Sequence, residues 1–219
     1  MAKQFAVLGL GNFGFSLAVT LEKLGCDVVV VDSSEERIKQ IADHVSYALC
    51  ADVQDKELLK MLGARNLDGV VVAISEKLEA SILATLLAKE LGAPYVLAKA
   101  QSDVHADILR KLGADTIVFP EREMGSRVAK ILATKNFADW IELSPDYSMV
   151  EVPVPVGWVG KGLRELNVRG RLGINVVGVI RGKQVSVNIS PDELFQNGDV
   201  IIIVGENKIL NKFSKGNME

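Results

Sequence analysis

The sequence predicts an α/β fold in which a doubly wound parallel sheet is followed by a smaller α+β domain. Short β-branched runs recur every 19 to 25 residues, and segments with helical periodicity separate them. This spacing is typical of βαβ units. The runs begin near Phe5, Asp27, Ser46, Gly69, Pro94 and Asp115.

Two of these runs show how the first sheet is covered. Residues 28–31 and 70–72 are all valine, so these strands are apolar on both faces. A parallel sheet with helices on both sides requires such strands. Pro120 then opens a helix expected over residues 120–135, because proline is well tolerated in the first turn. We assign residues 1–138 to this first domain, with the linking helix included.

Residues 139–219 form the second predicted domain, which is small and rich in strands. Arg181-Gly182-Lys183 is typical of a hairpin turn, and Asn197-Gly198-Asp199 of another turn. The strands are expected at 149–152, 175–180, 184–187 and 200–204, with one short helix at 162–166.

Composition excludes several classes of protein. The chain has 219 residues, 48% hydrophobic and 24% charged, which indicates a globular protein with a substantial core. Its apolar runs are far shorter than the roughly 20 residues of a membrane-spanning helix, and no secretory signal is apparent, so cytosol is the default compartment. The net charge is −3 without clustered Lys and Arg, which argues against nucleic-acid binding. Cys26 and Cys50 lie in apolar segments and are expected as buried free thiols.

The segment Gly9-Leu10-Gly11-Asn12-Phe13-Gly14 is a G-x-G-x-x-G motif between the first strand and the first helix. Gly9 permits the tight turn, Gly11 allows a diphosphate to approach the backbone, and Gly14 allows helix and strand to pack closely. The alternative is that the glycines serve packing alone. In this context the motif predicts a Rossmann-like nucleotide-binding domain.

Asp32 ends the second strand, 18 residues beyond Gly14, where a carboxylate can accept both ribose hydroxyls of an adenosine. No Arg or Lys follows it immediately, so a ribose 2′-phosphate is not favoured. Ser33 and Ser34 have the alternative role of capping the next helix.

Further candidates follow later strands, because ligands bind at the carboxyl edge of such sheets. Asp52 and Asp55 are as well suited to capping a helix as Asp52 is to contacting adenine. Lys99 would neutralise phosphate charge, the alternative being a solvated lysine. Helix-dipole stabilisation alone would account for Glu121, and His105 is slightly better explained as a capping or surface residue. The candidates are Asp52-Val53, Ala73-Ile74-Ser75, Lys99-Ala100-Gln101, His105 and Glu121.

These blocks, and the order in which they occur, resemble the cytosolic RCK (regulator of potassium conductance) subunits of Ktr and Trk potassium uptake systems. The resemblance covers essentially the whole chain. The glycine motif is common to many proteins, but the Lys-Ala-Gln and Pro-Glu-Arg-Glu-Met-Gly blocks are more specific. The matching segments are residues 9–14, Asp32, 51–52, 71–74, 99–101, 113–115 and 120–125.

The resemblance implies a gating protein and not an enzyme. Such subunits bind ATP, ADP or NAD(H), and homodimers assemble into a ring, usually an octamer. The ring docks beneath a membrane-embedded potassium-translocating subunit, so the protein would be cytoplasmic and peripheral on the inner face of the cell membrane. Different nucleotides must then favour different ring states, because a ligand with equal affinity for both shifts nothing.

By the same resemblance, the glycine loop serves the diphosphate, Asp32 with Ser33 and Ser34 serves the ribose, and Asp52 with Val53 faces the adenine. Glu121 matches an acid at the dimer interface that helps to bind a cation, and two symmetry-related carboxylates suit Mg²⁺ or Ca²⁺. The rest of the pocket would be lined by Leu10, Asn12, Phe13, residues 73–75, residues 99–101 and His105.

One position departs from the family pattern. ATP-responsive Ktr relatives carry Arg in the glycine loop, where it reaches the terminal phosphate of the nucleotide in the neighbouring subunit. This chain has Asn12 there, and a neutral amide cannot make the same charge-assisted contact. ATP/ADP discrimination is therefore less favoured, and NAD(H) stays open.

Some relatives bind cyclic di-AMP between two C-terminal modules. Arg169, Ile174 and Asn175 fall where a guanidinium, an apolar wall and an amide would meet this ligand. The alternative is that Arg169 faces solvent and Asn175 only starts a strand.

Two other classes compete with a gating subunit. A small NAD-dependent oxidoreductase would need an acid/base residue in its second domain, yet the chain has no His and no Cys from Trp140 onward. A nucleotide-sensing transcriptional regulator would need a helix-turn-helix with a basic recognition helix, and none is apparent.

Overall fold

The computed structural model describes residues 2–74, 77–133 and 139–214. The chain divides into two compact units, Met1–Glu121 and Arg122–Glu219. Helix α6 (Pro120–Ala133) spans this division and covers most of the predicted linking helix. The predicted boundary after residue 138 stays a prediction, because residues 134–138 lie outside the described part of the chain.

The first unit contains a six-stranded parallel sheet with the order β3-β2-β1-β4-β5-β6. β1 pairs with both β2 and β4, so the strand order reverses beside β1. This reversal creates the switch point at which doubly wound sheets bind ligands. The predicted Rossmann-like sheet is confirmed. Its strands are β1 (Gln4–Leu8), β2 (Asp27–Asp32), β3 (Tyr47–Cys50), β4 (Gly69–Val72), β5 (Val96–Lys99) and β6 (Thr116–Val118).

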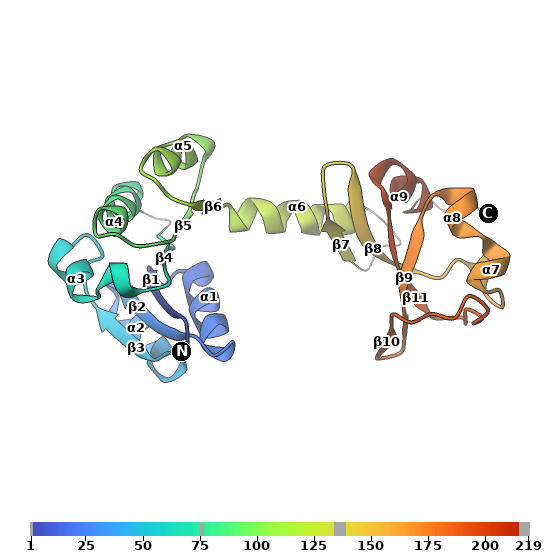
Figure 1. Cartoon of the computed structure of the whole chain (residues 1–219), viewed down its shortest axis with the longest axis horizontal. Helices are drawn as coiled ribbons and strands as arrows, with labels where there is room; N and C mark the ends of the chain where they lie inside the picture. The colour runs from blue at the N-terminus through green and yellow to red at the C-terminus, as the bar shows by residue number, and fades with distance from the viewer. Residues whose placement is uncertain (1, 75–76, 134–138, 215–219) are drawn as a thin grey trace. The chain divides into compact units, whose positions relative to one another are not determined.

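Helices cover both faces of this sheet (Figure 1). They follow the strands in turn, as βαβ connections require. The helices are α1 (Asn12–Lys23), α2 (Glu35–Ile41), α3 (Lys56–Met61), α4 (Leu78–Glu90) and α5 (Asp103–Lys111), with the short 3₁₀ turns η1 (Ala42–His44) and η2 (Ala64–Asn66).

The two faces of the sheet have separate hydrophobic cores. Leu8 belongs to the core that also contains Leu59 of α3 and Leu109 of α5. Its neighbour Val7 belongs to the other core, with Ala18 of α1 and Ile41 of α2. Alternate residues of β1 thus point to opposite faces, and each buried Leu or Ile contributes about 2 kcal/mol by leaving water. This packing fixes the carboxyl ends of the central strands.

At the sheet edge, β3 is largely exposed. Both cysteines are free thiols, as predicted, but Cys50 is exposed and Cys26 is only half-buried. The expectation that they are buried is therefore wrong. The physical reason for Cys50 is its edge strand, since an edge strand pairs on one side only.

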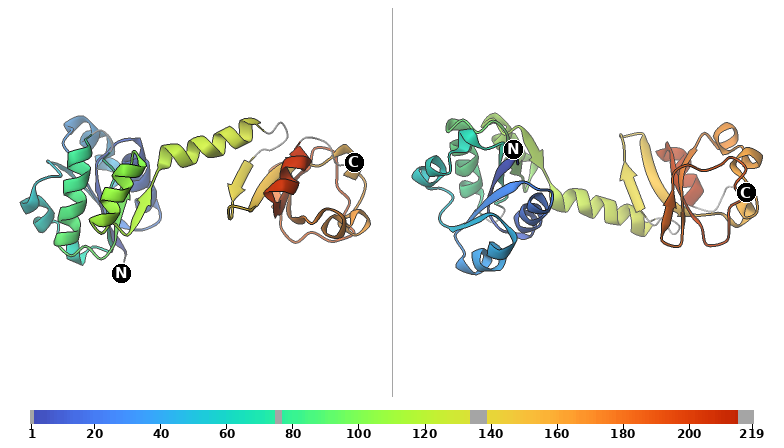
Figure 2. Two further views of the ribbon diagram at one scale, coloured as in Figure 1. Left: turned by 90° about the horizontal axis from the view of Figure 1, so that it is seen from above. Right: turned by 60° about the horizontal axis from the view of Figure 1, so that its bottom comes forward.

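The second unit contains a five-stranded antiparallel sheet with the order β10-β9-β11-β8-β7. The elements of this unit are coloured yellow to red in Figure 2. The predicted α+β class of this unit is confirmed. Strand β7, the short helix α8 and the helix α9 were not predicted. The elements are β7 (Asp139–Glu142), β8 (Tyr147–Pro153), η3 (Val156–Trp158), α7 (Leu163–Leu166), α8 (Val168–Leu172), β9 (Asn175–Arg181), β10 (Gln184–Ser186), β11 (Val200–Glu206) and α9 (Asn207–Ser214).

An ion pair joins two strands of this unit. The carboxylate of Asp199, 1% exposed, accepts hydrogen bonds from Nε and Nη2 of Arg181, both at 2.8 Å, and from the backbone N–H of Gln196 at 2.8 Å. The guanidinium lowers the pKa of Asp199. Arg181 also begins the predicted hairpin turn, in which Gly182 adopts a φ of +62°. The pair therefore fixes β9 against the start of β11.

Candidate functional site

The loop between β1 and α1 has the geometry that its three glycines allow. Gly9 adopts a φ of +99°, which L side chains rarely adopt. A Cβ on Gly14 would lie 2.0 Å from the carbonyl oxygen of Gly9, so helix and loop touch there. A Cβ on Gly11 would meet nothing within 4 Å. Gly11 therefore faces open space, which is the arrangement needed for a ligand to approach the backbone.

The start of α1 is suited to an anion. Gly11 occupies the N-cap position and provides no side-chain cap, and the first turn contains no acidic residue. The first N–H groups of a helix lack partners inside the helix, and its dipole places partial positive charge there. The loop thus offers backbone donors to a phosphate group.

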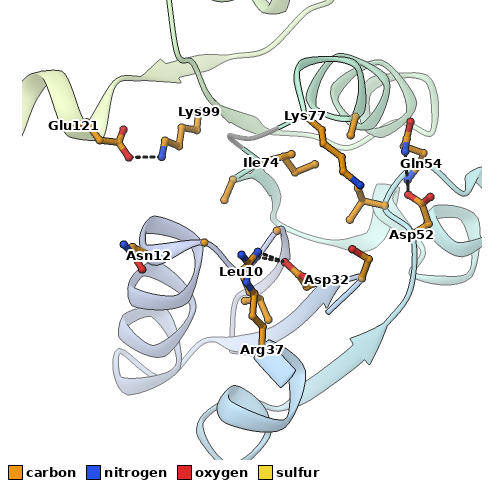
Figure 3. A pocket seen from close by; sticks show the side chains of 16 residues that line it. Leu10, Asn12, Asp32, Arg37, Asp52, Gln54, Ile74, Lys77, Lys99 and Glu121 are labelled. Carbon is orange, nitrogen blue, oxygen red and sulfur yellow. Dashed lines mark hydrogen bonds and ion pairs between the residues drawn. The ribbon is translucent and has the colours of Figure 1, made fainter. Parts of the chain in front are cut away.

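Asp32 lies at the end of β2, beside this loop, and is 6% exposed. Its carboxylate accepts the backbone N–H of Leu10 at 2.7 Å and that of Ser34 at 2.8 Å, and it also faces the side chain of Arg37 (Figure 3). Nη1 of Arg37 lies 3.6 Å from Oδ2 of Asp32. These contacts hold the carboxylate in one orientation at the switch point. Its remaining lone pairs are available to ribose hydroxyls.

Lys99 and Glu121 meet at the other end of the site. Nζ of Lys99 lies 2.5 Å from Oε1 of Glu121, and their side chains point toward one another (Figure 3). This ion pair lowers the pKa of Glu121. The ammonium also lies 6.0 Å from the ring centroid of Phe13, in the first turn of α1. Lys99 thus belongs to the site and is not a solvated lysine.

Most of the predicted residues line one cleft of about 320 Å³, within the size range of small-molecule sites. The cleft brings together Gly9, Leu10, Gly11, Asn12, Asp32, Ser33, Asp52, Val53, Ala73, Ile74, Lys99 and Glu121. Sequence reasoning missed four further lining residues, which are Arg37, Gln54, Lys77 and Ala80. The set predicted but absent from the lining comprises Phe13, Gly14, Ser34, Ala100, Gln101 and His105, while Ser75 lies outside the described residues.

Several residues outside the lining have structural roles. Ser34 caps α2, since its hydroxyl accepts the backbone N–H of Arg37. Ala100 is buried in the core. His105 is 2% exposed, and its Nδ1 accepts the backbone N–H of Gln101 at 3.3 Å. Burial lowers the pKa of His105. A surface position for this histidine is therefore wrong, because α5 packs it inward.

The structure separates the roles of two neighbouring aspartates. Asp55 is the N-cap of α3 and accepts the backbone N–H of Glu57 at 2.9 Å. Asp52 lines the cleft, and its carboxylate accepts the backbone N–H of Gln54 at 2.9 Å. Helix capping thus falls to Asp55, and the adenine contact proposed for Asp52 stays a prediction.

Charges of both signs line the cleft. Asp32 lies beside Arg37, and Glu121 pairs with Lys99. Lys77 has no acidic partner in the described part of the chain and reaches toward the Asp52 side of the cleft (Figure 3). Within residues 2–74, 77–133 and 139–214, no three His, Cys, Asp or Glu side chains gather into a metal-binding group. The backbone donors and cations of the cleft can bind the anionic part of a ligand. The buried carboxylate of Asp32 can accept hydrogen bonds from the ligand's hydroxyl groups.

The three residues considered for cyclic di-AMP lie in the second unit. Arg169 and Asn175 are exposed, and Ile174 is fully buried in the core of this unit. Ile174 thus supports the fold beneath the two polar residues, and its contact with a ligand stays a prediction.

The fold and cleft define a Rossmann-like α/β protein with a ligand-sized cleft at its switch point and a separate C-terminal unit. Two family models match the chain: the TrkA-N domain over residues 5–120 and the TrkA-C domain over residues 148–215. The chain therefore belongs to the family that the TrkA-N and TrkA-C domains define. Its described residues contain no helix that is long and apolar enough to span a membrane.

The chain is similar over nearly its whole length to Ktr proteins. It is 41% identical to Ktr system potassium uptake protein C of Bacillus subtilis, covering 98% of this chain and 97% of that protein. It is 36% identical to Ktr system potassium uptake protein A of the same organism, covering 99% and 97%. The predicted Ktr/Trk class is thus confirmed. These relatives are named as potassium uptake proteins and not as enzymes, so the oxidoreductase alternative is not favoured.

Solved structures share the fold. The RCK domain of GsuK superposes with a TM-score of 0.67 at 18% identity, covering all of this chain and 48% of that one. A structure of the GsuK channel bound to NAD gives 0.66 at 18% identity, covering all of this chain and 40% of that one. The chain thus spans less than half the length of these structures.

Proposed function

We propose that this protein is the nucleotide-binding gating subunit of a membrane potassium transporter or channel. One observation carries the proposal. The cleft at the switch point joins an open glycine loop, an oriented carboxylate and a buried lysine, in a chain that matches Ktr proteins from end to end. Physically, the nucleotide must stabilise one assembled state more than another.

The ligand is an adenine nucleotide, either ATP/ADP or NAD(H). Asp32 faces the ribose, and the glycine loop and Lys99 face the phosphates. Asn12 lines the cleft beside the loop and supplies an amide where ATP-responsive relatives have a guanidinium. Structures of GsuK described as bound to NAD and to ADP support a fold that accommodates both ligands. Because the amide of Asn12 is neutral, both ATP/ADP and NAD(H) stay candidates for the ligand.

A divalent cation, Mg²⁺ or Ca²⁺, is the further ligand that Glu121 would hold. Its side chain is 72% exposed, so a second subunit can approach it. One carboxylate is a weak site by itself, and two related by a dimer axis supply the hard oxygen ligands that such cations need. The cation would partly offset the charge of the nucleotide phosphates.

The partners are a second copy of this chain and a potassium-translocating membrane subunit. Helix α6 exposes an apolar stripe, Met124, Val128 and Leu132, spaced four residues apart on one helical face. This stripe supports a homodimer, and dimers would assemble into an octameric ring on the cytoplasmic face of the membrane. Cyclic di-AMP at Arg169 and Asn175 is an additional ligand that rests on the family resemblance alone.

A thermal-shift titration of the full-length protein tests the proposal. ATP, ADP, NAD⁺, NADH and cyclic di-AMP are added to the wild type and to Asp32→Ala. A ligand that binds only the folded protein stabilises it by about 2.7 kcal/mol at 100 times its Kd. We expect an adenine nucleotide to raise the melting temperature of the wild type and to lose most of this effect in Asp32→Ala.

The matched control is Asp55→Ala, because Asp55 caps α3 and lies outside the cleft. It should lower the melting temperature and keep the nucleotide response. If no adenine nucleotide shifts the wild type, the proposal fails. Steady consumption of NADH with carbonyl substrates would favour the oxidoreductase alternative instead.

A further inference from the structure

The phosphate end of the cleft is closed by a pair of unequal partners. Lys99 ends β5 with a side chain that is 7% exposed, and Glu121 is the second residue of α6 with a side chain that is 72% exposed. Their charged atoms are 2.5 Å apart. The pair therefore joins a cation that the sheet fixes in place to an anion that reaches solvent.

This asymmetry decides which partner can leave. A buried ammonium without a counterion is costly, so Lys99 needs an anion beside it at all times. The Glu121 carboxylate can exchange this contact for water at little cost to itself, because its side chain is 72% exposed and is solvated again when it leaves. An anion that entered the cleft would thus replace Glu121 and leave Lys99 in place.

The start of α1 favours a phosphate over the Glu121 carboxylate as the anion beside Lys99. Lys99 lies 6.0 Å from the ring centroid of Phe13, in the first turn of α1. A phosphate at this position would receive both the ammonium and the free N–H groups of the helix start. Glu121 also lines the cleft, and no hydrogen bond from the α1 amides to its carboxylate is found among the described residues.

We propose that Glu121 occupies the place of a ligand phosphate on Lys99 and that a phosphate-bearing ligand displaces it. Glu121 is then a specificity-determining residue, because its displacement is favourable only for ligands with phosphate charge. Adenosine, which carries none, leaves the pair intact. The inference rests on the proposed function, and it adds that the cleft selects its ligand by a competition for Lys99.

Calorimetric titrations of the full-length protein with adenosine and ADP, in EDTA, test this competition. Without divalent cations, Glu121→Gln should bind ADP about fivefold more tightly, because the competitor of the phosphate has lost its charge. Adenosine affinity should stay unchanged. Lys99→Gln should weaken ADP binding at least about tenfold. Glu90→Gln removes the acid of the exposed Lys56–Glu90 pair outside the cleft and is the matched control with no effect.

The double variant Lys99→Gln/Glu121→Gln separates exchange from general repulsion. If Glu121 acts through Lys99, its substitution has no effect once Lys99 is replaced. A gain in ADP affinity that persists in the Lys99→Gln background would show direct repulsion and overturn the proposal. Unchanged or weaker ADP binding by Glu121→Gln in EDTA would also overturn it. If the wild type binds no adenine nucleotide at all, the proposed function itself fails, and this inference with it.

Discussion

Gly11 and Gly14 belong to one motif, but the structure gives them different physical roles. Gly14→Ala would place a Cβ 2.0 Å from the Gly9 carbonyl oxygen, so the loop must shift and the protein should lose about 2 kcal/mol or more of stability. Gly11→Ala meets open space and should cost about 1 kcal/mol or less, through a poorer N-cap. Urea denaturation measures both effects.

Gly11→Ala should still weaken ADP binding, measured by calorimetry, because its methyl group occupies the space through which the ligand approaches the backbone. ADP affinity equal to that of the wild type would contradict a phosphate at this loop.

Single residues were predictable where the signal is contiguous in the sequence. The glycine loop and Asp32 could be placed because strand, loop and helix follow one another directly. Arg37 was missed because it returns to Asp32 from the first turns of α2, and Lys77 because it enters from the loop after β4. The Lys99–Glu121 contact joins residues 22 positions apart, and spacing does not report side-chain direction. The same limit explains why the burial of His105 was not foreseen.

Elements were predictable where their pattern is long. The parallel strands could be predicted from runs that are apolar on both faces, such as residues 70–72 of β4. Strand β7 has only four residues, two of them acidic. This segment is too short for an alternation of apolar and polar residues to identify it as a strand. Helix α9 is a short segment at the end of the chain, and its packing on β8 and β11 comes from the tertiary structure.

The ion pair between the end of β9 and the start of β11 predicts a pH dependence for the second unit. Asp199 has a lowered pKa in the folded state because of Arg181, so it binds fewer protons when folded than when unfolded. Its contribution is therefore present above about pH 4, the ordinary range of Asp, and is lost as the pH falls through the lowered value. Asp199→Asn should cost about 2 kcal/mol at pH 7.

The stability difference between wild type and Asp199→Asn should shrink as the pH falls from 5 to about 3. Urea denaturation followed by tryptophan fluorescence measures it, because both tryptophans, Trp140 and Trp158, lie in the core of the second unit. Asp192→Asn is a suitable control, since it removes an exposed ion pair with Arg164. A difference that stays constant down to pH 3 would assign the stabilisation to packing and not to charge.

At the scale of the whole molecule, gating requires that nucleotide binding in one chain alter contacts between chains. The structure supplies two features that a single chain leaves incomplete. Glu121 offers one carboxylate where a divalent cation needs several oxygen ligands, and the α6 stripe of Met124, Val128 and Leu132 is exposed. Both lie on the same helix, and a second copy of the chain would complete both. The cleft and the assembly would then be coupled through α6.

Val128→Asp tests this arrangement directly. Val128 is 44% exposed in the single chain, so an aspartate there is compatible with the fold, but a charge buried in an interface without a partner is costly. Analytical ultracentrifugation should show a smaller assembly for Val128→Asp than for the wild type, while tryptophan fluorescence shows that each chain is still folded. Leu24→Asp is the control, because Leu24 is an exposed apolar residue at the end of α1, in the other compact unit, and is not part of the stripe. An assembly of wild-type mass in Val128→Asp, or equal dissociation in both variants, would remove the stripe as the subunit interface.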